Sequence, residues 1–225
     1  MPLQTRKKNV TSIESLKTQD FVKFHKTEKS LEILHPKLIL IIEWNYFKML
    51  NESVSDATKY LSIFWNAVNL KYKEISTPQV KVIITGIFIA KDDAAIDFIL
   101  RSRNKENPQK FDELKLLSLG NEYFGRTFKK EANFRNYDSA VLMTNFTAGS
   151  TRGGTIRGQI CNKNIIYVSD DANYGGIAKA IHELAHSFGL SHDSKNPLRG
   201  SPSRSLMEPY TTSPETYYWS DQSLE

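Results

Sequence analysis

Three of the chain's five histidines fall within eleven residues, in the run His182-Glu-Leu-Ala-His-Ser-Phe-Gly-Leu-Ser-His-Asp. Apolar residues recur at three- and four-residue steps through residues 176–190, which predicts an amphipathic helix. On a helix, His182 and His186 lie one turn apart on the same face, so both imidazoles can bind a single ion. The segment therefore predicts a metal site with the carboxylate of Glu183 beside it.

The end of this helix predicts a third ligand. Gly189 can adopt a backbone conformation that other residues resist, which lets the chain leave the helix and return His192 toward the same ion. Three protein ligands and one open position are typical of catalytic zinc, whereas structural zinc usually has four ligands, often cysteines, and this chain has one cysteine. A single helical histidine is usually a surface or core residue, but the combined spacing favours one zinc ion per chain, held by His182, His186 and His192.

Length and charge indicate one globular domain with a basic N-terminal segment. The 225 residues, 40% of them hydrophobic, are enough to bury a core. Residues 1–30 hold seven lysines or arginines and three acids, most of the chain's net charge of +5. We therefore expect a basic segment over 1–34, either a flexible tail or a propeptide remnant, and a domain over 35–225. Nucleic acid is not expected as a partner, because the remainder is nearly neutral and lacks interleaved stacking aromatics.

Alternating strand and helix patterns predict an α/β domain. The apolar run 37–44 has the length of a buried strand, and residues 80–90 are rich in β-branched and aromatic side chains. Residues 55–73 have helical apolar spacing, with Ser55 or Asp56 placed as the N-cap. The other predicted elements are an irregular polar stretch over 91–118, a helix over 121–134, and strands around Ala140, Thr155 and Ile166.

The histidine motif resembles the extended zinc signature of the metzincin proteases. Asp193, directly after the third histidine, is similar to the adamalysin or reprolysin branch, which includes ADAM-type and snake-venom proteases. Residues 205–209, Ser-Leu-Met-Glu-Pro, resemble the methionine turn that lies beneath the metal in this family. The resemblance covers roughly residues 35–225. It implies a zincin-like α/β (α+β) fold: a twisted, mostly parallel sheet with an antiparallel edge strand, a long active-site helix and a small C-terminal subdomain with the Met turn.

The same resemblance implies the activity of a zinc endopeptidase, in which Glu183 is the general base that takes a proton from water. Gly189, Asp193 and Met207 would support the site, with Met207 forming a packing floor and no bond to the metal. An alternative of a different class is a catalytically inactive binding protein on a protease fold, with structural zinc. The intact Glu183 favours the enzyme.

The resemblance also implies where a protein or peptide substrate binds. The substrate would add as a strand to the sheet edge that contains Gly153, Gly154 and Thr155. In relatives, the segment just past the Met turn forms the wall of the pocket for the side chain after the cleaved bond. Pro209 and Tyr210 occupy this place, and both a direct contact and an exposed turn remain open for them.

Secretion is a further implication of the resemblance, with venom, saliva and tissue all open as origins. Asn9, Asn51 and Asn145 begin Asn-X-Ser/Thr sequons and would be glycosylation acceptors in that compartment. The first ten residues lack the apolar core of a signal peptide, so we expect a mature or truncated piece of a longer precursor. No run approaches the roughly twenty apolar residues of a membrane span, so no membrane association is expected. We expect a monomer.

Two positions depart from the family pattern. Cys161 stands where relatives have a disulfide cysteine, but the chain has no second cysteine. A buried thiol is the favoured interpretation and intermolecular pairing the alternative. Many reprolysins bind structural calcium through an acid in the first strand and an aspartate that Asp138 resembles. The first-strand position here is Leu38, so we expect calcium binding to be lost or weak.

Overall fold

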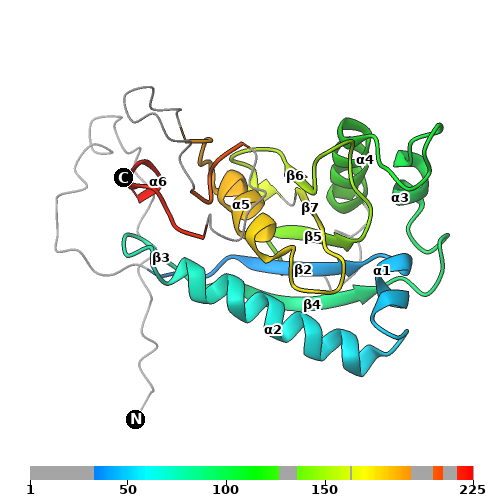
Figure 1. Ribbon diagram of the computed structural model, residues 1–225, viewed down its shortest axis with the longest axis horizontal. Coiled ribbons are helices and arrows are strands. Elements are labelled where there is room, and N and C mark those ends of the chain that lie inside the picture. The colour runs from blue at the N-terminus through cyan, green and yellow to red at the C-terminus, as the bar shows by residue number, and fades with distance from the viewer. Residues whose placement is uncertain (1–32, 127–135, 163, 194–204, 210–216, 225) are drawn as a thin grey trace, which may run out of the picture. The chain divides into compact units, whose positions relative to one another are not determined.

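The computed structural model describes the unit Leu31–Glu225 over residues 33–126, 136–162, 164–193, 205–209 and 217–224. Its centre is a five-stranded sheet with the strand order β4-β2-β5-β7-β6 (Figure 1). β4, β2, β5 and β7 are parallel, and β6 is antiparallel to β7 at one edge, which confirms the predicted fold class. The strands span Lys37–Ile42 (β2), Ile83–Ile89 (β4), Ser139–Thr144 (β5), Gly153–Thr155 (β6) and Ile165–Ser169 (β7).

Helices cover both faces of this sheet. One face carries α2 (Val54–Tyr72) and α5 (Ile177–Phe188), and the other carries α3 (Asp97–Ser102) and α4 (Glu113–Arg126). No helix in the described ranges has the length and apolar character that crossing a membrane requires. The remaining described elements are α1 (Trp44–Met49), α6 (Asp221–Leu224), a 3-10 helix (Ile160–Asn162), and the parallel pair β1 (Ile33–Leu34) and β3 (Gln79–Val80).

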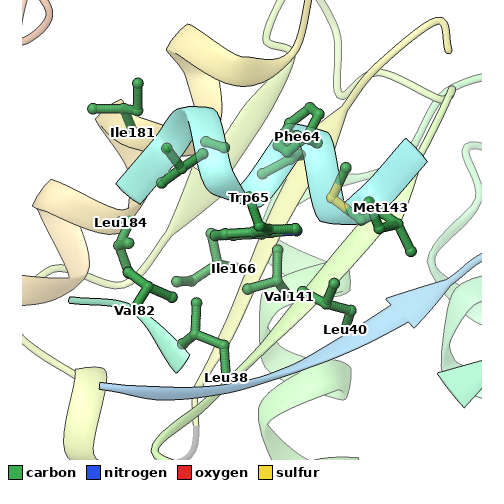
Figure 2. Packing of buried hydrophobic residues seen from close by; sticks show 14 of the residues in the cluster. Leu38, Leu40, Phe64, Trp65, Val82, Val141, Met143, Ile166, Ile181 and Leu184 are labelled. Carbon is green, nitrogen blue, oxygen red and sulfur yellow. The ribbon is translucent and has the colours of Figure 1, made fainter. Parts of the chain in front are cut away.

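Strand β2, which lies between β4 and β5, is buried on both faces, which explains its uninterrupted apolar sequence. Leu38 and Leu40 belong to the apolar cluster under α2 and α5. Ile39 and Ile41 alternate with them and belong to the cluster under α3 and α4. Figure 2 shows Trp65 of α2 pointing into the first cluster, among side chains of the sheet.

Two predicted boundaries differ from the structure. The first strand ends at Ile42, because Glu43 caps α1 by accepting a backbone N–H of its first turn. The cap of α2 is Ser53, whose hydroxyl accepts a backbone N–H of the first turn at 3.2 Å. The prediction of Ser55 or Asp56 as this cap is wrong, since both residues lie inside the helix.

The prediction of an irregular stretch over 91–118 is wrong, because the stretch contains α3 and the first part of α4. Asp112 caps α4 by accepting a backbone N–H at 3.1 Å, several residues before the predicted start at 121. The helical pattern is hidden in the sequence because a glycine, Gly120, occupies a buried position of the helix. A Cβ at Gly120 would lie 2.8 Å from Cδ1 of Ile165, so the glycine allows α4 to approach β7 closely.

Cys161 is exposed, and the expectation of a buried thiol is therefore wrong. The residue lies in the 3-10 helix that connects β6 with β7. It belongs to neither apolar cluster, because this connection runs over the surface.

Replacing Gly120 with alanine is expected to lower the free energy of unfolding by about 1–3 kcal/mol, the range typical of an overpacked core. Gly125 in the same helix is the matched control, because a Cβ there would meet no atom within 4 Å. Gly125→Ala should instead raise the free energy of unfolding, by up to about 1 kcal/mol, through helix propensity. Urea denaturation of both variants checks this, and equal responses would contradict the close approach of α4 to β7.

Candidate metal centre

The start of α5 is fixed by a buried carboxylate at the end of β7. Asp170 accepts hydrogen bonds from the hydroxyls of Tyr46 at 2.7 Å and Tyr60 at 2.6 Å. Its other oxygen accepts the N–H of Gly176, the N-cap of α5, at 2.7 Å. Asp170 is fully buried. A buried carboxylate without donors is costly, so these partners hold Asp170, and with it the first turn of α5, in one position.

The three predicted histidine ligands converge on one point. His182 and His186 lie one turn apart on α5, and Gly189 ends the helix with a φ of +114°, which returns the chain toward His192. The Nε2 atoms of His186 and His192 are 3.0 Å apart, and those of His182 and His192 are 3.3 Å apart. Nitrogen ligands of a tetrahedral zinc ion are separated by about 3.3 Å, so these atoms fit around one ion. No fourth side chain of the described residues joins this group, so a zinc ion bound here would keep one position for a non-protein ligand.

Hydrogen bonds on the other side of two imidazole rings set the orientation of these ligands. Nδ1 of His182 donates to the carbonyl oxygen of Leu206 at 2.6 Å, and Nδ1 of His186 donates to that of Leu190 at 2.7 Å. A proton on Nδ1 leaves the lone pair on Nε2, the atom that faces the shared point. Burial lowers the pKa of His182 to about 3, so this ring is neutral, the form that binds a metal. The donor set therefore fits zinc.

Glu183 directly follows the ligand His182 on α5, and its side chain is buried. The residue is 4% exposed, and its Oε1 atom is 3.7 Å from Nζ of Lys179, one turn earlier on α5. Burial raises the pKa of Glu183 to about 7, and the charge of Lys179 opposes this shift. A carboxyl group with a pKa near neutrality can both accept and release a proton at the metal centre.

Two consecutive glycines let the edge strand β6 pack closely on both of its faces, and the side chain of Glu183 lies on one of them. A Cβ at Gly153 would lie 2.8 Å from Cγ of Glu183 and 2.6 Å from Cγ of Lys179. On the opposite face of the strand, a Cβ at Gly154 would lie 2.6 Å from the ring of Tyr167 and would also collide with Glu113. Both glycines are predicted to lie on the substrate-binding edge of the sheet, and the structure shows that they also allow β6 to pack between α5 and α4.

Asp193 joins the ligand loop to the Met turn and to the C-terminal segment. Its carboxylate accepts the hydroxyl of Ser205, that of Ser220 at 2.6 Å and that of Ser223 at 3.2 Å. Its N–H donates to the carbonyl oxygen of Met207 at 2.9 Å, and Met207 is fully buried. The sequence did not predict that these three serines bind Asp193, because they belong to other segments of the chain and form no motif with it.

The residues predicted as the pocket wall and as glycosylation acceptors differ in their exposure to solvent. Pro209 is exposed, and Tyr210 and Asn9 lie outside the described residues. Asn51 is exposed in the turn after α1. Asn145 is partly buried, and its Oδ1 atom is inaccessible to solvent and has no hydrogen-bond partner among the described residues.

The positions considered for calcium have other roles. Leu38 is fully buried in the apolar core. Asp138 accepts the N–H of Lys37 at 2.7 Å. Within the described part of the chain, the histidine triad is the one group of three or more His, Cys, Asp or Glu side chains close enough to share an ion.

Replacing Asp193 with alanine is expected to lower the free energy of unfolding by about 2–4 kcal/mol, because buried hydroxyl donors lose a charged acceptor. Asp171 is the matched control, since it pairs with Arg152 at the surface. Asp171→Ala should cost no more than about 1 kcal/mol. Thermal unfolding and zinc content of both variants provide the measurement. An Asp193 variant as stable as the Asp171 variant would show that the carboxylate does not hold the segments together.

Solved structures show the fold of this chain. Metalloproteinase-II from Bacteroides fragilis superposes with a TM-score of 0.53 at 13% identity, over 85% of this chain and 54% of that chain. A chain of a chaperone-substrate complex superposes with a TM-score of 0.55 at 17% identity, over 83% of this chain and 29% of that chain.

Curated relatives are similar in sequence. Venom metalloproteinase 2 from Eulophus pennicornis is 37% identical over 171 residues, 74% of this chain and 42% of the relative. Venom metalloproteinase 3 from the same organism is 37% identical over 163 residues, 71% of this chain and 40% of the relative. A Bombyx mori protein described as "A disintegrin and metalloproteinase with thrombospondin motifs like" is 24% identical over 73% of this chain and 26% of its own length. The chain thus spans about two fifths of the venom relatives.

The family model described as "Reprolysin (M12B) family zinc metalloprotease" matches residues 36–225. This range contains the histidine triad, which is the zinc-binding group typical of reprolysins. The chain therefore belongs to the reprolysin (M12B) family of zinc metalloproteases.

Proposed function

We propose that the chain hydrolyses internal peptide bonds of proteins as a zinc endopeptidase, with Glu183 as the general base. The observation that carries this proposal is the convergence of His182, His186 and His192 beside a buried carboxylate. Three ligands leave one position for water or substrate, as catalytic rather than structural zinc sites do.

A zinc ion held by His182, His186 and His192 would supply Lewis acidity, which would polarise the scissile carbonyl and favour deprotonation of the attacking water. Glu183 accepts the proton of this water and passes it to the leaving amine. Lys179 holds one carboxylate oxygen of Glu183 from the same face of α5. Gly153 keeps the backbone of β6 next to the base, because a larger residue would displace either the strand or the carboxylate. Gly189, Asp193 and Met207 support the ligands without contacting the reacting atoms.

The substrate binds in an extended conformation along β6, the edge strand of the sheet. Such a strand gives affinity through main-chain hydrogen bonds and does not select a particular side chain at every position. Gly153 and Gly154 contribute backbone atoms only. The side chain of Thr155 is directed to β7, since its hydroxyl donates to the carbonyl oxygen of Ile165 at 3.2 Å. Pro209 and Tyr210 are proposed as the wall of the pocket for the side chain after the cleaved bond.

Replacing Glu183 with glutamine is expected to reduce turnover by about two to four orders of magnitude while zinc remains bound, because the base is lost but the ligands are not. Cleavage of casein by the purified full chain, with and without a zinc chelator, measures this, with zinc quantified on the same samples. Glu106→Gln, the same change at an exposed position far from the triad in the chain, is the control.

The outcomes separate two functions. Chelator-sensitive cleavage by the wild type and by Glu106→Gln, but not by Glu183→Gln, supports the endopeptidase. Stoichiometric zinc without cleavage by the wild type would instead indicate a binding protein on a protease fold. A fully active Glu183→Gln would refute the role given to Glu183.

Secretion, glycosylation and a monomeric state are part of the proposal. Support for secretion comes from the relatives, which are named venom metalloproteinases. Asn51 is the acceptor best supported by the structure, because it is exposed in a turn. Asn145 is a poorer acceptor, because its side-chain oxygen is buried. Asn9 remains a prediction from its sequon.

In a secretory expression host, Asn51→Gln is expected to remove most of the glycan at these two sites, whereas Asn145→Gln should change the mass little. Mass spectrometry before and after enzymatic deglycosylation provides the measurement. A larger loss from Asn145→Gln would contradict the difference in exposure of the two side chains.

A further inference from the structure

Two arginines flank the edge strand β6, and their surroundings differ. Arg152 precedes the strand and forms an ion pair with Asp171 at 2.5 Å. Arg157 follows the strand and donates to the hydroxyl of Ser191, a neutral group. Both arginines are exposed. No carboxylate of the described residues pairs with Arg157, so its charge is uncompensated within this part of the structure.

The position of Arg157 is fixed relative to the metal centre from two sides. The N–H of Gly158, the next residue, donates to the carbonyl oxygen of His186 on α5 at 3.0 Å. Ser191, which accepts from Arg157, directly precedes the ligand His192. The segment after β6 is therefore held against both the zinc helix and the ligand loop.

Two cations lie near the metal centre: Lys179 on α5, and Arg157 in the segment that is held against α5 and the ligand loop. Of these two cations, Lys179 is already paired with Glu183 at 3.7 Å. Arg157 is the one whose charge remains available to a bound peptide.

We infer that Arg157 is a specificity-determining residue, which selects peptides carrying an aspartate or glutamate side chain within a few residues of the scissile bond. The inference rests on the proposed endopeptidase activity and on binding of the peptide along β6. A peptide on this edge passes Arg157 where the strand ends. The guanidinium group offers two parallel N–H donors that match the two oxygens of a carboxylate.

Arg157 gains when it exchanges the hydroxyl of Ser191 for a carboxylate of the substrate, because a charged acceptor then replaces a neutral one. The hydroxyl of Ser191 is exposed and regains its hydrogen bond from water, so releasing it costs little. Arg157 itself is exposed, which limits the gain to that of a partly solvated ion pair, about three- to fivefold in kcat/KM. The preference should weaken as salt concentration rises.

The test uses the full chain with zinc and a set of matched peptides that carry glutamate, glutamine or lysine at each of three positions on either side of the cleaved bond. Wild type should cleave the glutamate peptide about three- to fivefold faster than the glutamine peptide at one or more positions. Arg157→Gln should bring this ratio to one, and Arg157→Glu should favour the lysine peptide. Arg152→Gln, the matched control, should keep the wild-type ratio because the charge of Arg152 is already paired.

Each failure has a separate meaning. A wild type that cleaves the three peptides equally at every position overturns the inference and leaves the endopeptidase proposal intact. A glutamate preference that survives in Arg157→Gln, or is lost equally in Arg152→Gln, also overturns the inference. Absence of any cleavage by the wild type overturns the proposed function and the inference together. Thermal unfolding of the variants confirms that they are folded.

Discussion

The buried carboxylate of Asp193 is the interaction on which the metal centre depends. It connects three segments that are far apart in the chain: the loop that carries His192, the Met turn through Ser205, and the C-terminal segment through Ser220. The Met turn in turn provides the carbonyl oxygen of Leu206 that orients His182. A carboxylate can accept about four hydrogen bonds, so hydroxyl groups are sufficient to satisfy its charge in the interior. The positions of two ligands therefore depend on one acid that does not itself touch the metal.

Both ends of α5 are held by the same chemistry. Asp170 fixes its first turn through tyrosine hydroxyls, and Asp193 fixes the loop beyond its last turn through serine hydroxyls. Between them, the hydroxyl of Tyr72 donates to the carbonyl oxygen of Ile181 at 2.9 Å. Arginine or lysine could satisfy these carboxylates too, but an additional buried cation would repel a divalent ion bound nearby. Hydroxyl donors position the helix without adding positive charge, which suits a helix that carries two metal ligands.

The sequence predicts the metal centre well because its information is local. The spacing within residues 182–193 places two histidines by helix geometry and the third by the turn at Gly189, and the structure brings these side chains together as expected. The supporting groups could not be predicted in this way, because Ser220 meets Asp193 only through the tertiary fold. The start of α4 was missed for a related reason, since Gly120 weakens the helical pattern while serving a close contact with β7. The wrong expectation for Cys161 has a different cause. Free cysteines are often buried, but this residue lies in a connection that runs over the surface, where it is exposed.

The edge strand links packing directly to the proposed chemistry. Successive residues of a strand point to opposite faces, so the approach of α5 on one face and of Tyr167 on the other requires a glycine at each of two consecutive positions. Gly153 leaves no room for a Cβ beside the Glu183 side chain, and Gly154 leaves none beside the ring of Tyr167 on β7. A peptide that paired to this edge, as proposed, would lie one strand spacing, about 4.8 Å, from the backbone of β6. Under the proposed binding mode, the sheet itself would set the distance between Glu183 and the substrate, and a methyl group at either glycine would change this distance by moving the strand.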